Sequence, residues 1–106
     1  MANFKLIFQI LSLLDKYLDY EDPDWSKLSA GNFKVTETRF INIMIMLYES
    51  GYIAGIDVVP LMDGHYDIKL LEPRITLKGL EYLEENTNMK KAYHMIKGLS
   101  EIIPRL

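Results

Sequence analysis

The first segment of the chain, residues 3–19, has the hydrophobic spacing of an amphipathic helix. Its apolar side chains recur every three or four positions, and its polar side chains lie on the opposite side of a helical wheel. The apolar positions are Phe4, Leu6, Ile7, Ile10, Leu11, Leu13, Leu14, Tyr17 and Leu18. We therefore predict a helix here, with half of its circumference facing the core.

An acidic stretch containing Pro23 interrupts this pattern at residues 20–24. Proline disfavours helix at the residue before it, and Asp22 or Asp24 can cap a helix that follows. A short second helix is predicted over residues 25–30, ended by the turn residues Gly31-Asn32.

A third helix is predicted from residue 37 to residue 50. Val35 and Thr36 precede it as a hydrophobic N′ residue and an N-cap, and Glu37 suits its first turn. Gly51 stands where a left-handed C-terminal cap is needed.

Residues 52–71 are rich in β-branched and aromatic side chains and contain Asp63-Gly64 at their centre. This dipeptide is typical of a two-residue type I′ hairpin turn. Such a turn places Leu61 opposite Tyr66 and Val59 opposite Ile68, with all four on one apolar face. Pro60 has no N–H to donate, which indicates an edge strand.

Residues 72–75 are expected to cross back to a fourth helix, 77–86, capped by Thr76. We place Leu77, Leu80 and Leu83 on its apolar side. Asn88 is expected to cap a final helix of residues 89–103, which Pro104 ends.

The predicted order is three helices, a β-hairpin and two helices. This is the layout of a winged helix-turn-helix, so we predict an α+β, mostly helical fold in which the hairpin is the wing. A chain of 106 residues has room for one domain. We assign 1–106 to it, with a core of about 3–86 and a C-terminal helix of about 88–103.

The chain also resembles a known family. The resemblance covers most of its length and lies in residues 49–55 (ESGYIAG), residues 75–86 (ITLKGLEYLEEN), residues 91–93 (KAY) and residues 96–97 (IK). These segments are similar to the YjcQ-like proteins, small winged-helix proteins of Gram-positive bacteria and their phages. The resemblance implies the fold and no particular activity. We interpret Thr76 as a helix cap and Gly79 as a close approach of two backbones.

Composition narrows the possible functions. The chain has no cysteine, so disulfides and thiolate metal sites are excluded, and a reducing, cytoplasmic location is expected. No stretch reaches the roughly 20 apolar residues of a membrane span. With two histidines and no recognisable nucleophile or phosphate-binding motif, we expect neither an enzyme nor a cofactor.

Polar residues at the start of the third helix are the candidates for contacts with duplex DNA. They are Lys34, Thr36, Thr38, Arg39 and Asn42. Arginine and asparagine are good readers of base edges, and lysine suits a phosphate. The net charge of −3 and the acidic wing oppose this interpretation, because phosphate affinity depends on clustered cations. The alternative is a protein-interaction module, such as an acidic phage-type modulator of a host nucleic-acid enzyme.

The third helix is apolar around most of its circumference, so part of it is expected to meet another surface. The candidates are Ile41, Ile45 and Tyr48, which would pack against the terminal helices or in a homodimer. In the last helix a basic stripe of Lys90, His94 and Lys97 is either its solvated side or a docking face.

Asp63, His65 and Asp67 alternate along the predicted hairpin, and carboxylate oxygen with imidazole nitrogen suits divalent metals. Two of them fall in the turn and no fourth ligand is near in sequence, so we predict no metal site.

Overall fold

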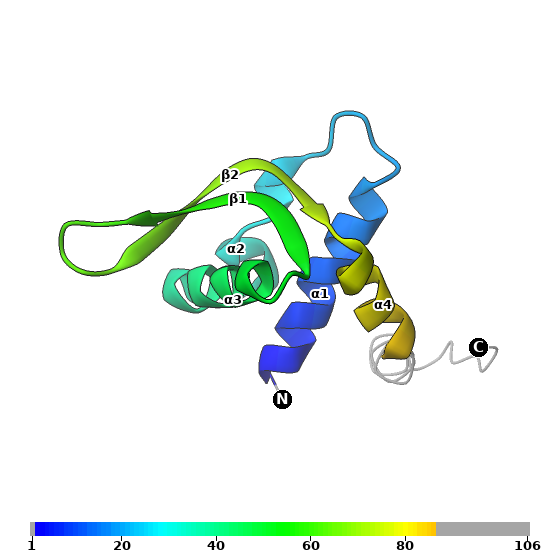
Figure 1. Ribbon diagram of the computed structural model, residues 1–106, viewed down its shortest axis with the longest axis horizontal. Helices are drawn as coiled ribbons and strands as arrows, with labels where there is room; N and C mark the ends of the chain where they lie inside the picture. The colour runs from blue at the N-terminus through cyan, green and yellow to red at the C-terminus, as the bar shows by residue number, and fades with distance from the viewer. Residues whose placement is uncertain (1, 87–106) are drawn as a thin grey trace.

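The computed structural model describes residues 2–86, and Figure 1 shows their arrangement. Within this part of the chain the fold is α+β and about half helical, with a two-stranded antiparallel hairpin. The elements are α1 (Ala2–Tyr17), the 3₁₀ helix η1 (Trp25–Lys27), α2 (Ala30–Phe33), α3 (Glu37–Glu49), β1 (Ile53–Pro60), β2 (Tyr66–Ile75) and α4 (Leu77–Glu85). This order is compatible with the predicted winged helix. The predicted last helix, with Lys90, His94 and Lys97, lies outside the described residues.

The core lies where α1, α3 and the base of the hairpin meet, and α1 also packs against α4. Its largest fully buried side chains come from α1, α3 and β1, and they are Leu6, Ile10, Leu11, Leu14, Met44 and Ile53. Burying one such side chain contributes about 1.5–3 kcal/mol, so the predicted apolar rows of α1 are the main anchor of the fold. The helix ends at Tyr17, two residues before the predicted end.

The predicted second helix over residues 25–30 is wrong. Asp24 does cap η1 by accepting the N–H of Ser26, but this helix stops after a single turn. Ser29 then caps α2 by accepting the N–H of Asn32, so Gly31-Asn32 lies inside a helix instead of ending one. The prediction missed Ser29 as a second N-cap.

The third helix begins at the predicted residue, Glu37, and ends at Glu49, one residue before the predicted end. The Oγ1 atom of Thr36 accepts the N–H of Arg39 at 3.1 Å, which satisfies one of the free donors of the first turn. Gly51 follows the helix with φ +84°, the left-handed conformation expected of a C-terminal cap.

The hairpin is confirmed, but the predicted register is wrong by one residue. Pro60 pairs with Tyr66 and Val58 with Ile68, so Val59 and Ile68 lie on opposite faces. Two hydrogen bonds close the tip: Gly64 N–H donates to Leu61 O and Leu61 N–H to His65 O. This is the bonding of a three-residue loop with a bulged glycine, and only Gly64 needs a positive φ, here +92°.

β2 continues through residues 72–75, which were predicted to be a crossing segment. The pairing steps from Ile56–Leu70 to Ala54–Arg74, so three residues of β2 bulge opposite Gly55. A Cβ atom on Gly55 would lie 2.0 Å from the carbonyl oxygen of Glu72. The bulge is therefore possible because residue 55 is glycine, and it accommodates the buried Pro73 within the strand.

α4 is joined to the end of α3 through its cap. Thr76 accepts the N–H of Gly79 at 3.2 Å and donates its hydroxyl to Gly51 O at 2.6 Å. A Cβ atom on Gly79 would lie 2.5 Å from Tyr52 O, so the predicted close approach is confirmed. Leu80 and Leu83 pack against the core, but Leu77 is 80% exposed and its predicted apolar role is wrong. As the first residue of the helix, it lies beyond the packed face.

Candidate functional site

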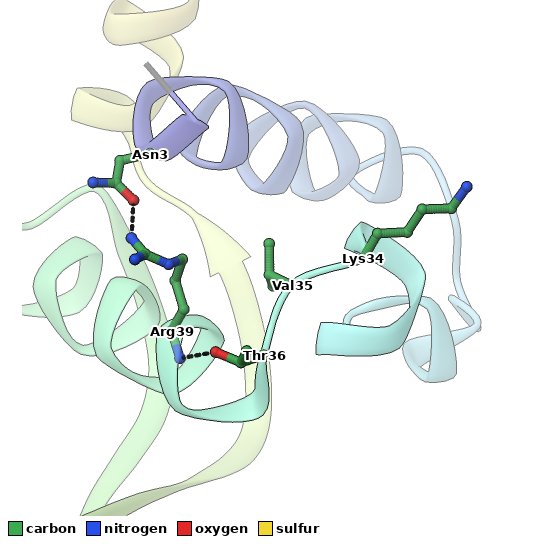
Figure 2. A pocket seen from close by; sticks show the side chains of 5 residues that line it. All are labelled: Asn3, Lys34, Val35, Thr36 and Arg39. Atoms are coloured by element: carbon green, nitrogen blue, oxygen red, sulfur yellow. Dashed lines mark hydrogen bonds between the residues drawn. The ribbon is translucent and has the colours of Figure 1, made fainter.

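An open depression of about 570 Å³ lies where the start of α1 meets the connection between α2 and α3. Figure 2 shows the residues that line it: Asn3, Lys34, Val35, Thr36 and Arg39. Three of the five predicted DNA-contacting residues, Lys34, Thr36 and Arg39, are thus brought together around one hollow. Asn3 was not predicted, because it reaches this place only through the packing of α1 on α3.

Lys34 has an unusual backbone conformation. Among the non-glycine residues of the described chain, Lys34 is the one that has a positive φ, with φ 60° and ψ 45°. Its N–H and that of Val35 donate back to Gly31 O and Ala30 O, the bonding of a Schellman motif, whose left-handed position usually holds glycine. A lysine is strained here by about 1–2 kcal/mol. Its exposed side chain extends from the edge of the depression, away from Val35 (Figure 2).

Arg39 is oriented by a contact across the depression. Its Nη1 donates to Oδ1 of Asn3, while its own backbone N–H is held by Thr36 (Figure 2). Within residues 2–86 its guanidinium makes no other polar contact, and the side chain is exposed, so a ligand can reach its remaining donors. The oxygen of Thr36 is engaged in capping, so its first role is to fix the start of α3.

The depression has an apolar centre between two cations. Figure 2 shows Val35 between Arg39 and Lys34, whose side chains extend to opposite sides. Within residues 2–86 no carboxylate forms an ion pair with either cation. The nearest acid in sequence is Glu37, which is exposed in the first turn of α3. The site is therefore locally basic on a chain whose net charge is −3.

Thr38 and Asn42 do not line the depression. Both are exposed on α3, and their four-residue spacing places them on one face, next to each other along the helix axis. Met46, which is 52% exposed, continues this face. The exposed face of α3 is therefore mixed, with polar residues near its start and a methionine near its end.

The predicted partner surface is only partly accessible. Ile41 and Ile45 are half-buried, whereas Tyr48 is 40% exposed. They lie on the side of α3 away from Arg39, so they do not form one surface with the depression.

The tip of the hairpin is a second exposed feature, which the sequence prediction missed. Met62 is fully exposed, Leu61 is 44% exposed and Tyr66 57% exposed. The predicted register places Leu61 and Tyr66 on one apolar face of the hairpin, yet both side chains are exposed.

The acid in this turn is engaged locally. Asp63 accepts the backbone N–H of His65 at 3.0 Å, and its other oxygen lies 3.2 Å from His65 Nδ1. These two contacts lower the pKa of the Asp63 carboxyl. No cluster of three potential metal ligands occurs in the described part of the chain.

These features define a small α+β protein with a helical core, a projecting hairpin and a basic depression at the start of one helix. The model of the YjcQ protein family matches residues 8–102, and the chain belongs to this family. It is 37% identical over 76 residues to "Uncharacterized protein YjcQ" of Bacillus subtilis (strain 168), covering 72% of this chain and 78% of that protein. The predicted family resemblance is confirmed. No solved structure matches the chain significantly.

None of the helices in residues 2–86 has the length and apolar character needed to cross a lipid bilayer.

Proposed function

We propose that this protein binds duplex DNA as a small winged-helix regulator, with α3 as the helix that faces the major groove. In this proposal α2 and α3 form the helix-turn-helix and the β1–β2 hairpin is the wing. Lys34 and Arg39 contact phosphates, and Asn42 and Thr38 face base edges. Thr36 positions the helix.

One observation carries the proposal: Lys34 and Arg39 line the same depression at the start of α3, and neither is neutralised by an acid in residues 2–86. Thr38 and Asn42 are exposed on the same helix, within reach of a duplex laid along it. The strain at Lys34 supports a functional role, since strained residues tend to persist where a site requires them.

The charge of the chain limits the affinity. The hairpin carries four acids, Asp57, Asp63, Asp67 and Glu72, against two cations, Lys69 and Arg74, so a second cationic contact from the wing is weak. Two phosphate contacts per protomer predict that the logarithm of the binding constant falls with the logarithm of salt concentration with a slope of about −2. A homodimer that leaves both depressions open would double this slope and the basic surface on DNA.

Fluorescence anisotropy with random and genomic duplexes across a salt series tests the proposal. Lys34→Ala and Arg39→Ala should each weaken binding to all sequences and reduce the slope by about 1. Asn42→Ala should instead lower discrimination between sequences. Lys16→Ala is the matched control, because this exposed cation lies about 20 Å from Asn3 along α1. Absence of salt-sensitive binding at low ionic strength contradicts the proposal.

Binding rather than catalysis is proposed as the activity, and access to DNA implies the cytoplasm. The contact between His65 and Asp63 could serve acid–base chemistry, but their side chains are 79% and 66% exposed. Such chemistry is usually performed in a water-excluded cleft, which this turn does not provide.

A second candidate function is protein binding, by a module such as a modulator of a host nucleic-acid enzyme. It is favoured by the exposed apolar residues Leu61, Met62 and Tyr66 on an acidic hairpin. Nuclease-treated lysate passed over immobilised protein tests it, with Met62→Asp as the matched control. Recovery of a protein by the wild type and not by the control supports this candidate. If the wild type retains no protein beyond those that the control also retains, this candidate is contradicted.

A further inference from the structure

The hairpin tip presents apolar side chains away from the body of the protein. Figure 1 shows the β1–β2 hairpin extending past α3, on the side of the molecule opposite α4. Met62 stands at its end, fully exposed, with Leu61 beside it at 44% exposure. Large apolar side chains that project in this way are typical of protein contact surfaces.

The tip is also preorganised. The hydrogen bonds between Leu61 and both Gly64 and His65 close the loop, and Asp63 accepts a third from the His65 N–H. The backbone of Met62 is therefore fixed before any partner arrives. Binding then has a low entropic cost, since little of the loop remains to be ordered.

The depression at the start of α3 complements this tip. Val35 lies at its centre, with Lys34 and Arg39 on either side (Figure 2). The tip has the converse arrangement, in which the apolar residues are accompanied by the exposed carboxylates of Asp63 and Asp67. If the tip entered the depression, its apolar side chains would meet Val35, and its carboxylates would face the cations. The depression, of about 570 Å³, has room for the side chain of Met62.

We propose that the hairpin tip of one copy inserts Met62 into the Lys34–Val35–Arg39 depression of a second copy, and that the second copy returns the same contact. Such a reciprocal pair forms a closed two-fold dimer in which each copy completes the depression of the other. Each contact is small, so the dimer is weak and concentration-dependent. The contact covers Lys34 and Arg39. If the proposed function is right, formation of the dimer therefore competes with the binding of DNA phosphates. The dimer itself does not depend on DNA binding.

Sedimentation velocity over a range of protein concentrations tests the dimer. The wild-type chain should shift toward twice its monomer mass as concentration rises. Met62→Asp and Arg39→Glu should each lower the association constant at least about tenfold, because each removes an interaction twice per dimer. Leu77→Asp is the matched control, since it places the same acid at another highly exposed apolar residue, on α4. Circular dichroism should show that all three variants remain folded.

A mixing experiment tests the reciprocal geometry. The Met62→Asp variant keeps its depression and the Arg39→Glu variant keeps its tip, so a mixture can form one of the two contacts. Mixing should therefore produce mixed dimers at concentrations where each variant alone stays monomeric. These mixed dimers should be weaker than the wild-type dimer, because they hold one intact contact instead of two. A monomeric wild type at every concentration overturns the proposal. Association that survives Met62→Asp, or variants that do not complement each other, also overturns it.

Measuring DNA binding of the same variants distinguishes a failure of the dimer proposal from a failure of the proposed function. If both are right, Met62→Asp binds DNA at least as tightly as the wild type, while Arg39→Glu loses both DNA binding and association. A concentration-dependent dimer that binds no DNA at low salt supports the inference and contradicts the proposed function. The opposite result, DNA binding by a strict monomer, contradicts only the inference.

Discussion

Arg39 and Asn3 are 36 residues apart in sequence and meet in a hydrogen bond across the depression. The bond joins the first turn of α3 to the start of α1 and aims the guanidinium along the edge of the hollow (Figure 2). Two exposed side chains contribute little stability by such a contact. Its main effect is on where the positive charge of Arg39 lies.

Substitutions of Asn3 should therefore change DNA binding more than stability. Asn3→Ala leaves Arg39 charged but less well oriented, so binding weakens modestly. Asn3→Asp places a carboxylate beside the guanidinium and offsets its charge, so binding weakens further. Anisotropy titrations should rank affinity as wild type, then Asn3→Ala, then Asn3→Asp, with free energies of unfolding that agree within about 1 kcal/mol. An Asn3→Asp variant that binds as well as the wild type would show that Arg39 does not contact DNA.

Two substitutions of Lys34 distinguish its effect on stability from its effect on DNA binding. Lys34→Gly removes the strain of a side chain at positive φ, so the free energy of unfolding should stay constant or rise by up to about 1 kcal/mol. Lys34→Ala retains the strain and gives no such gain. Both variants lose the same charge and should weaken DNA binding equally. Urea denaturation and anisotropy measure the two effects, and a clear loss of stability in Lys34→Gly would contradict the account of this residue.

The glycines at close backbone contacts should tolerate no side chain. Gly55→Ala places a Cβ atom 2.0 Å from Glu72 O at φ +84°, and Gly79→Ala places one 2.5 Å from Tyr52 O. We expect each to lower the free energy of unfolding by more than about 2 kcal/mol. Gly31→Ala is the control: it meets nothing within 4 Å and lies in a helix, so it should stabilise by roughly 0.5–1 kcal/mol. Thermal unfolding of the three variants checks this order.

Deprotonation of two tyrosines, Tyr17 and Tyr82, is expected to lower the stability of the protein at alkaline pH. Burial raises the pKa of Tyr17 and of Tyr82, so both hold their protons more tightly in the folded state than in the unfolded state. Their contribution is fully present below the unfolded pKa of about 10 and is lost as the pH rises through the higher folded pKa. Urea denaturation between about pH 9 and 11 should show this decline.

Tyr17→Phe provides the check on this prediction. The variant loses the 2.7 Å hydrogen bond to Asp24 O, so it should be about 1 kcal/mol less stable at neutral pH. It should also lose less stability than the wild type as the pH rises. If the free energy of unfolding falls equally in both proteins at alkaline pH, groups other than Tyr17 cause the decline.

Features set by neighbouring residues could be predicted from the sequence. Thr36 and Thr76 are caps because a hydroxyl three residues before a free N–H can reach it, and Gly51 ends α3 because positive φ suits glycine. The hairpin was located correctly by Asp63-Gly64. Its register was not, because this dipeptide fits a two-residue turn and also a three-residue loop with a bulged glycine.

Features set by tertiary packing could not be predicted. The bulge opposite Gly55 depends on contacts between strands, and the contact between Asn3 and Arg39 depends on how α1 crosses α3. The positive φ of Lys34 runs against local preference, so no pattern would indicate it. Of the candidate site, the sequence indicated the cations but neither the hollow between them nor the exposed tip.

The most direct test of the proposed DNA interface is a titration of ¹⁵N-labelled protein with a short duplex at low salt, followed by amide chemical shifts. The account predicts that perturbations concentrate in residues 34–42 and at the side-chain amides of Asn3 and Asn42, and that they reverse when salt is added. Perturbations confined to α4 or to the Tyr17–Trp25 segment, or none at any duplex concentration, would contradict it.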